Sequence, residues 1–416
     1  MSILLTNAIL FNLDPIGITR GGLRVVDGTI TQTGPDVVPA PDEDTLDCHG
    51  AVVLPGLVNG HTHLYSALAA GMPPPPIAPK NFHEILQFVW WRLDRALDAE
   101  SIETSARIGA LDALRSGTTT LIDHHASPNA IDGSLDRIEQ GIADVGLRAV
   151  LCYEITNRNG RAGADAGLAE NGLYLTKCQD CGGDQFAALV GAHAAFTLTD
   201  KTLRECVDMA EEFDTGIHIH VAEDPCDDAI CRAKYGAPLV ERLASCGLLP
   251  GGASESVAAA SILAHGTHLA PQDATRISGQ IAALAHNPRS NMNNHVGYAP
   301  VGHMQNVLLG TDGIGGDMFT EARHAWFKAR DAGASLAPNQ IVDMLAHAAR
   351  TAGRALGTTI GRLAPGAAAD LVVTDYVPAT PIQSDNAAAH LIFALGPRHV
   401  RHVAVAGQWV LKNSCP

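Results

Sequence analysis

The stretch PGLVNGHTH, Pro55–His63, joins an apolar run to a pair of histidines and decides the fold. The run Ala51–Val58 is typical of a buried strand, and His61 and His63 follow where such a strand would end. Residues i and i+2 of an extended segment face the same way, so both imidazoles can point to one place. Active sites of parallel barrels lie at the carboxyl ends of the strands. The stretch therefore predicts a barrel strand that carries a functional pair.

The middle of the chain repeats this alternation of apolar runs and helical segments. Amphipathic stretches such as Ala99–Ser116 and Leu203–Phe213 separate most of the runs, and the span from His61 to Asp312 is close to the usual size of a closed barrel. Eight such runs predict an α/β fold, a (β/α)8 TIM barrel. The eight runs are Ala51–Val58, Thr118–Ile122, Arg148–Cys152, Phe186–Val190, Thr215–His220, Ser261–Ala264, Ile281–Ala285 and Val307–Leu309.

Both ends of the chain are rich in short β-runs instead. These are Ser2–Phe11, Leu23–Thr33, Ala369–Asp375 and His402–Leu411. The pairs Gly21-Gly22 and Asp27-Gly28 are turn signals between strands. We expect residues 1–53 and 363–416 to form one small β-sandwich domain, and residues 54–362 to form the barrel.

Composition excludes several classes of protein. Of the 416 residues, 46% are hydrophobic and 17% charged, which is too apolar for a disordered chain. A net charge of −16 disfavours binding to nucleic acid or to anionic membranes. No apolar run reaches the roughly 18 residues of a membrane span, and the N-terminus does not resemble a signal peptide. Nine cysteines are sparse and odd in number, so a cytoplasmic protein is expected.

Two local features have simple interpretations. The segment Met72–Lys80 contains four consecutive prolines and predicts a stiff loop after the first run. Cys178 and Cys181 form a CxxC without the second ligand pair of a zinc knuckle, so we expect a loop with free thiols.

Polar residues follow several of the predicted strands. They are His61 and His63 after the first run, His218, His220 and Glu223 at the fifth, His265 and His268 at the sixth, and Asp312 after the eighth. Any one of them could be a core histidine or a turn aspartate. Their coincidence at separate strand ends favours a metal with one position left for water, since imidazoles and a carboxylate suit borderline metal ions.

The chain resembles the amidohydrolase superfamily, in the branch of cytosine, guanine, 8-oxoguanine and S-adenosylhomocysteine deaminases and triazine hydrolases. The resemblance rests on PGLVNGHTH (Pro55–His63), HVAE (His220–Glu223), AHGTHL (Ala264–Leu269), HNPRSNM (His286–Met292), GTDG (Gly310–Gly313) and GRLAPGAAADLVV (Gly361–Val373). Within the branch, Asn81–Asp98 and Asn287–Pro300 are most similar to the aminohydrolases called SsnA.

The resemblance implies roles for individual residues. The metal ligands would be His61, His63, His220 and Asp312, with Glu223, His265 and Asp312 as the catalytic, proton-handling residues. Relatives with two metals carry a bridging lysine after the fourth strand, and Phe186–Thr197 contains none. One divalent ion is therefore expected, zinc first and iron as the alternative. Hydroxide generated at the metal would attack a ring carbon and release ammonia.

Five further residues are candidates for substrate contact, each with a plainer alternative. Trp91 could stack on a ring or pack in the core, and Arg92 could pair with the substrate or with a surface carboxylate. His193 commonly touches substrate in this branch, and either His125 or its neighbour His124 could do so. Asn291 could contact the substrate or could instead shape its loop through backbone hydrogen bonds. The candidates are His125, His193, Trp91, Arg92 and Asn291.

Three functions fit these residues. The first is hydrolytic deamination of an amino-substituted purine, pyrimidine, pterin or triazine. The second is a chlorohydrolase of triazine type, or hydrolysis of another C–N bond such as a cyclic amide, with the same metal site. The third is a non-catalytic barrel that only binds. The presence of both Glu223 and His265 favours deamination. Partners would be a small heterocycle and water, and the resemblance adds a homodimer.

Overall fold

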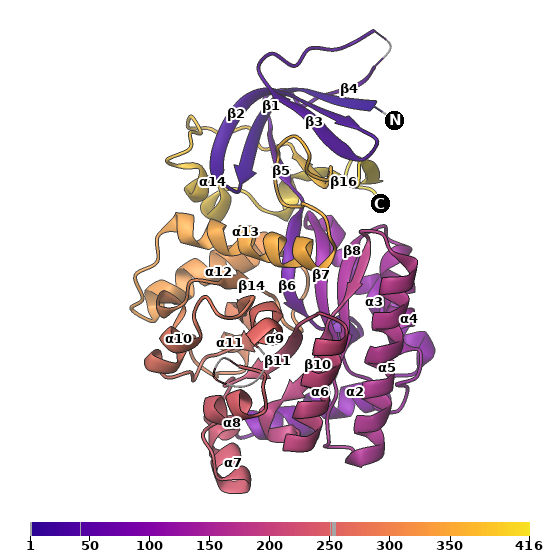
Figure 1. Cartoon of the computed structure of the whole chain (residues 1–416). Helices are drawn as coiled ribbons and strands as arrows, with labels where there is room; N and C mark the ends of the chain where they lie inside the picture. The colour runs from indigo at the N-terminus through magenta and orange to yellow at the C-terminus, as the bar shows by residue number, and fades with distance from the viewer. Residues whose placement is uncertain (1, 42, 250, 252–254) are drawn as a thin grey trace.

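The computed structural model describes residues 2–41, 43–249, 251 and 255–416, and it shows a barrel capped by a terminal sheet (Figure 1). All neighbouring barrel strands run parallel, in two hydrogen-bonded groups, β6 to β9 and β10 to β14. Single parallel bridges, Ile155 to Ala192 and Thr62 to Asp312, join the two groups into a closed ring. The strands are β6 (Leu57–Thr62), β7 (Thr118–His125), β8 (Arg148–Tyr153), β9 (Phe186–Ala188), β10 (Val190–Ala194), β11 (Ile217–Val221), β12 (Ile262–His265), β13 (Ala283–His286) and β14 (Val307–Leu309). The predicted (β/α)8 barrel is confirmed.

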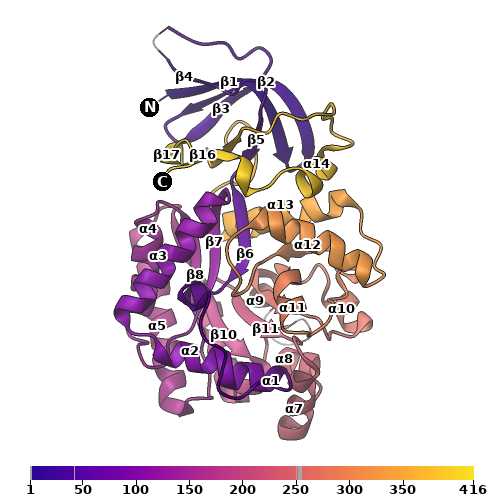
Figure 2. The ribbon, with the colours of Figure 1, turned by 180° about the vertical axis from the view of Figure 1, so that it is seen from behind.

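Helices surround the ring on its outer side, as both views show (Figures 1 and 2). Their apolar faces pack on the strands; in α3, for example, Ile102, Ala106 and Leu114 are buried, and a capping box at Asp98 and Ser101 starts the helix. The main helices are α3 (Ala99–Arg115), α4 (Ser134–Ala143), α5 (Gly160–Cys181), α6 (Asp200–Glu212), α7 (Pro225–Tyr235), α8 (Leu239–Ser245), α9 (Glu255–Ala260), α10 (Pro271–Ile277), α11 (Pro288–Asn293), α12 (Met318–Asp331) and α13 (Pro338–Ala355).

The segment between β6 and α3 lies over one side of the barrel mouth. The proline-rich stretch Met72–Lys80 has no helix or strand, as predicted. Short elements flank it: η1 (Leu64–Ala69) before it, and α1 (Phe82–Ile85), the π-helical turn η2 (Leu86–Trp90) and α2 (Trp91–Ala96) after it. The remaining short turns are η3 (Ala195–Thr197), η4 (Val301–His303) and η5 (Pro397–His399).

The two ends of the chain form one eight-stranded sheet, the basis of the predicted β-sandwich domain. Its order is β17-β16-β15-β5-β1-β2-β3, with β4 beside β1, and strands from the two ends meet where β5 pairs with β15. The strands are β1 (Ser2–Leu13), β2 (Ile16–Val26), β3 (Thr29–Gly34), β4 (Asp44–Asp47), β5 (Val52–Pro55), β15 (Leu371–Thr374), β16 (Val400–Val405) and β17 (Gln408–Leu411); α14 (Ala387–Phe393) lies beside them.

Three local expectations need correction. The first apolar run forms two strands, β5 and β6, which are separated at Gly56. This glycine packs closely on β7, since a Cβ there would lie 2.1 Å from Thr119 Oγ1. Gly21-Gly22 is no turn but lies inside β2, beside a register shift of β1; the turn at Asp27-Gly28 is present, with positive φ at both residues. The CxxC ends helix α5 and is not in a loop, and its two thiols are free.

No helix among the described residues is both long and apolar enough to cross a membrane.

A buried ion pair connects the barrel to the terminal sheet. Arg148, at the start of β8, donates through Nε to Asp370 Oδ2 at 2.9 Å, and both side chains are 1% exposed. Arg148 Nη1 also lies 2.9 Å from Asp184 Oδ1. The backbone N–H of Gly56 donates to the Asp370 carbonyl at 2.8 Å. Asp370 therefore also fixes the position of Gly56, where the chain passes from the sheet to the barrel.

We expect Arg148→Met to lower the free energy of unfolding by about 3–5 kcal/mol, because it leaves the Asp370 carboxylate buried without its counterion. Urea denaturation followed by tryptophan fluorescence measures this. The matched control is Arg137→Met, whose exposed pair with Glu103 at 3.3 Å contributes below about 1 kcal/mol. Equal losses in the two variants would contradict a stabilising role for the buried pair.

Candidate metal centre and catalytic pocket

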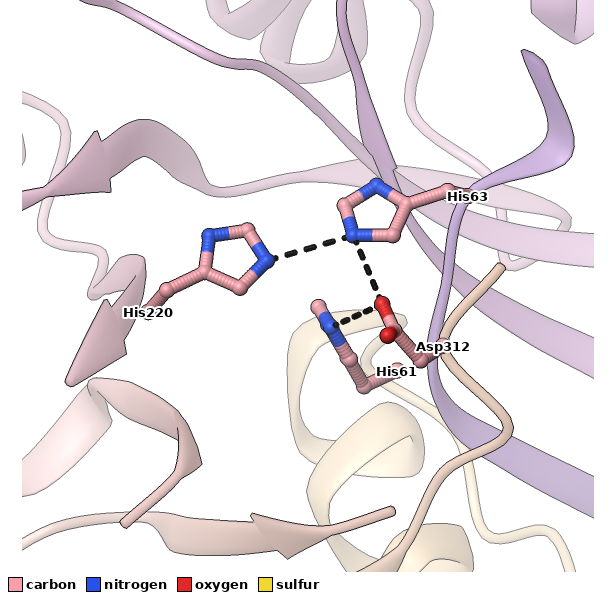
Figure 3. Close-up of side chains that lie close together, drawn as sticks. All are labelled: His61, His63, His220 and Asp312. Atoms are coloured by element: carbon pink, nitrogen blue, oxygen red, sulfur yellow. Dashed lines mark hydrogen bonds and ion pairs between the residues drawn. The ribbon is translucent and has the colours of Figure 1, made fainter. Parts of the chain in front are cut away.

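Four buried side chains converge at the barrel mouth, and they are the predicted metal ligands (Figure 3). His61 lies in β6 and His63 follows directly after it, His220 lies in β11, and Asp312 follows β14. Asp312 Oδ1 lies 3.0 Å from His63 Nε2 and 3.3 Å from His61 Nε2, and His63 Nε2 lies 3.2 Å from His220 Nε2. One ligand atom from each residue thus lies within 4.8 Å of all the others.

The outer ring nitrogens fix how these imidazoles are oriented. His63 Nδ1 donates to the carbonyl of His124 at 2.5 Å, and His220 Nδ1 donates to the carbonyl of His193 at 2.8 Å. A carbonyl only accepts, so each Nδ1 carries a proton and each Nε2 faces the centre. His61 Nδ1 lies 2.9 Å from His218 Nε2, which gives His218 a positioning role.

The cluster has the chemistry of a cation site. Burial lowers the pKa of His61 to about 3 and that of His220 well below its usual value, so these rings are neutral. His61 Nε2 makes no well-formed hydrogen bond among the described residues. Burial also lowers the pKa of His63, but the adjacent Asp312 outweighs it and raises that pKa to about 9. Three imidazole nitrogens and a carboxylate that face one point fit a divalent metal ion, which would displace the second proton of His63 on binding.

Close packing between β6 and β14 brings Asp312 to the histidines. A Cβ on Gly60 would lie 2.2 Å from Leu308 Cδ1, and one on Gly310 would lie 2.7 Å from the Cβ of His61. Glycine at both positions therefore lets the first and last barrel strands approach. Asp312 then turns inward with φ of 55°, a left-handed conformation that few residues other than glycine adopt and that functional sites often hold.

Glu223 and His265 lie beside the cluster, with one ligand atom of each within 4.8 Å of Asp312. His265 Nε2 is 3.6 Å from Glu223 Oε2, and its Nδ1 is 2.8 Å from Asn291 Oδ1. Burial, followed by the nearby charge of Asp312, raises the pKa of Glu223 well above its usual range. Burial thus favours the protonated form of the carboxyl, which can donate a proton.

A pocket opens above the metal cluster, and two of the five predicted substrate contacts line it. Trp91 and His193 face this pocket together with the ligands and Glu223. His125, Arg92 and Asn291 are not among the residues found to line it. His125 is buried with Nε2 on Ser127, Arg92 is exposed, and Asn291 holds His265.

The pocket also contains polar residues that the sequence analysis missed. Glu154 follows directly after β8, so the search at strand ends could have found it. Asn294 Nδ2 donates to Glu223 Oε1 at 3.5 Å. Asn294 lies three residues after Asn291, which the sequence analysis chose as the candidate in this segment. Asp94, which no sequence feature singled out, is buried and pairs with Arg158. A partner 64 residues away along the chain leaves no local sequence signal.

Comparison with known proteins gives one family and a consistent set of relatives. A profile of the amidohydrolase family matches residues 52–410. The chain is 31% identical to a 5'-deoxyadenosine deaminase of Methanopyrus kandleri, over 87% of this chain and 81% of that protein. It is 29% identical to a 5-methylthioadenosine/S-adenosylhomocysteine deaminase of Desulforudis audaxviator, over 99% of this chain and 94% of the relative.

Solved structures share the fold. A zinc-bound adenosine deaminase from Xanthomonas campestris superposes with a TM-score of 0.83 at 24% identity, over 99% of this chain and 93% of that one. An atrazine chlorohydrolase from Arthrobacter aurescens, complexed with zinc, gives 0.79 at 21% identity, over 100% and 96%. At these identities the likeness establishes a barrel with a β-sandwich domain.

We expect the purified protein to retain about one divalent ion per chain, because one set of four ligands converges. His220→Ala removes a ligand and should weaken metal affinity by about 10² or more. Elemental analysis after dialysis against a chelator measures both. His303→Ala, a change at an exposed histidine, is the control and should keep the wild-type metal content. Full retention of metal by His220→Ala would contradict the assignment.

Proposed function

The chain belongs to the amidohydrolase family, and from that premise we propose that it is a hydrolytic deaminase of an amino-substituted N-heterocycle. The observation that carries the proposal is the position of the Glu223 carboxyl, 3.6 Å from His265 Nε2, with both residues next to the ligand cluster. That pair supplies the proton that an aromatic ring nitrogen needs before the adjacent carbon accepts a nucleophile. A site that only bound a heterocycle would not need an acid with a raised pKa at this place.

His61, His63, His220 and Asp312 would hold the metal ion. When bound, a divalent ion lowers the pKa of water from 15.7 toward about 7. The Asp312 carboxylate, whose Oδ2 accepts a short hydrogen bond from Ser290, is oriented to take one proton of the water. The water oxygen then forms a bond to the ring carbon while Glu223 protonates the neighbouring ring nitrogen.

His265 and Asp312 complete the reaction. Burial lowers the pKa of His265, so its ring is neutral, and its Nε2 has no hydrogen-bond partner among the described residues. This nitrogen is placed to orient the water or to stabilise the oxyanion. The proton held by Asp312 passes to the amino group and the C–N bond breaks, so that ammonia leaves. The hydroxyl proton of the adduct returns to Glu223, which leaves a carbonyl on the ring and restores the acid.

Purines of adenosine type are the first substrates to test. The relatives are named as deaminases of 5'-deoxyadenosine, 5-methylthioadenosine and S-adenosylhomocysteine, and they match over most of the chain. We also propose that the protein is most similar to the SsnA aminohydrolases, on the resemblance of Asn81–Asp98 and Asn287–Pro300, and that it is a cytoplasmic zinc enzyme. We further propose that the β-sandwich domain comprises residues 1–53 and 363–416, and the barrel residues 54–362.

A triazine chlorohydrolase is the second candidate, since one structural relative carries that activity on the same fold. Both reactions would use the same ligands. They differ in the leaving group, so an assay that measures ammonia and chloride separately distinguishes them.

We expect Glu223→Gln to bind metal normally and to release ammonia at least about 10² more slowly, because glutamine cannot donate the proton to the ring nitrogen. An ammonia-release assay over purine nucleosides, pyrimidines, pterins and triazines, run beside metal analysis, measures this. Glu241→Gln, at an exposed glutamate of α8, is the matched control. Wild-type turnover in Glu223→Gln would refute the role of Glu223.

A further inference from the structure

A second cavity, which we call the barrel-base cavity, lies at the end of the barrel opposite the catalytic pocket. Its inner surface includes residues near the start of barrel strands, such as Val150 of β8 and Ile262 of β12. Its outer part is formed by the end of α5, the segment before β11 and the end of α13, which crosses the barrel beside the terminal sheet (Figure 1). Among the described residues, none lines both this cavity and the catalytic pocket.

Small residues leave this end of the barrel incompletely filled. The interior of such a barrel is normally packed with bulky branched side chains. Here Ala187, Gly216, Ala260 and Ala282 are among the lining residues. The cavity has a volume of about 270 Å³. An apolar cavity of roughly 150 Å³ is enough to bind benzene, so the body of a small organic molecule fits in this one.

The cavity opens beside the point where the two groups of barrel strands meet. Strand β9 is hydrogen-bonded to β8, and it has no strand partner on its other side among the described residues. On that side Thr215 Oγ1 donates to the Ala188 carbonyl at 3.3 Å, and both residues line the cavity. The interrupted pairing thus leaves an opening between β9 and the segment before β11.

Arg354, in the last turn of α13, supplies a cationic group to this opening. It is exposed and lines the cavity, and its guanidinium makes no hydrogen bond or ion pair with the described residues. Asp214 also lines the cavity and is exposed, but it does not pair with Arg354. Burial raises the pKa of the Cys178 thiol in the same lining to about 11, so that thiol is uncharged. The guanidinium is therefore available to an external anion.

The surroundings of Arg354 favour an anion over a cation. Arg354 also lines a shallow hollow next to the cavity, together with Arg350 and Arg362. These two arginines share one carboxylate, that of Asp14, at 2.8 and 2.7 Å. No aspartate or glutamate is among the described residues that line the hollow. The excess of positive charge there outweighs the single carboxylate of Asp214.

We propose that the barrel-base cavity binds a small organic monocarboxylate, with its apolar body inside the barrel and its carboxylate on Arg354. The planar guanidinium would donate two parallel hydrogen bonds to the carboxylate oxygens. This ligand site is separate from the metal centre, and the inference goes beyond the proposed deaminase function without depending on it.

The test measures the binding of phenylacetate and octanoate to the metal-loaded protein by isothermal titration calorimetry. Neutral phenylacetamide and cationic phenethylamine have similar apolar bodies and are the comparison ligands. Phenylacetate should bind at least about tenfold more tightly than either, because only a carboxylate pairs with Arg354. Arg354→Gln should remove this preference. Arg115→Gln, at an exposed arginine in the last turn of α3, is the matched control and should bind phenylacetate as the wild type does.

Two further variants test whether the apolar body enters the cavity. Ala282→Leu fills part of its inner end and should weaken the binding of both carboxylates by at least about tenfold. Ala355→Phe narrows the opening from the exposed end of α13, so it carries this part of the test if Ala282→Leu fails to fold.

Several results would overturn the proposal. Equal affinities for phenylacetate and phenylacetamide would remove the role of Arg354, and tighter binding of phenethylamine would assign recognition to Asp214 instead. The proposal also fails if neither carboxylate binds, or if Arg354→Gln or the two cavity variants bind them as the wild type does. Ammonia release by Arg354→Gln should match that of the wild type, so loss of carboxylate binding alone separates this site from the proposed catalytic function.

Discussion

The contact between the first and last barrel strands is the constraint on which the site depends. Only glycine fits at residues 60 and 310, where β6 and β14 approach each other. A side chain at either position would push the strands apart and separate Asp312 from His61 and His63. The ligand geometry is therefore a consequence of how the barrel closes, and Ser290 of α11 adds a hydrogen bond to Asp312.

Burial gives the residues of the site opposite protonation states for different tasks. Desolvation lowers the pKa values of His61, His220 and His265, which favours neutral rings, while it raises the pKa of Glu223, which favours the protonated carboxyl. Metal binding needs neutral imidazoles, and proton donation to a ring needs a protonated carboxyl. Removal of these groups from water at the mouth of the barrel thus favours both metal binding and proton donation.

The barrel and its ligands could be predicted because each depends on local sequence. Apolar runs mark the strands, and a polar residue just after a run marks the active edge, which is why His220 and Asp312 were found 92 positions apart. The far wall of the pocket could not be predicted in the same way. The pairing of Asp94 with Arg158 depends on how α2 packs on the barrel, and the inward or outward direction of His125 depends on the register of β7.

The ion pair between Arg148 and Asp370 lies at the start of β8, at the end of the barrel opposite the pocket. None of the residues found to line the pocket belongs to the terminal sheet. The ion pair that supports the barrel and the pocket that carries the proposed chemistry thus lie at opposite ends of the barrel. Substitutions in the sheet can therefore change the stability of the protein without changing the residues that line the pocket, provided that Asp370 is kept.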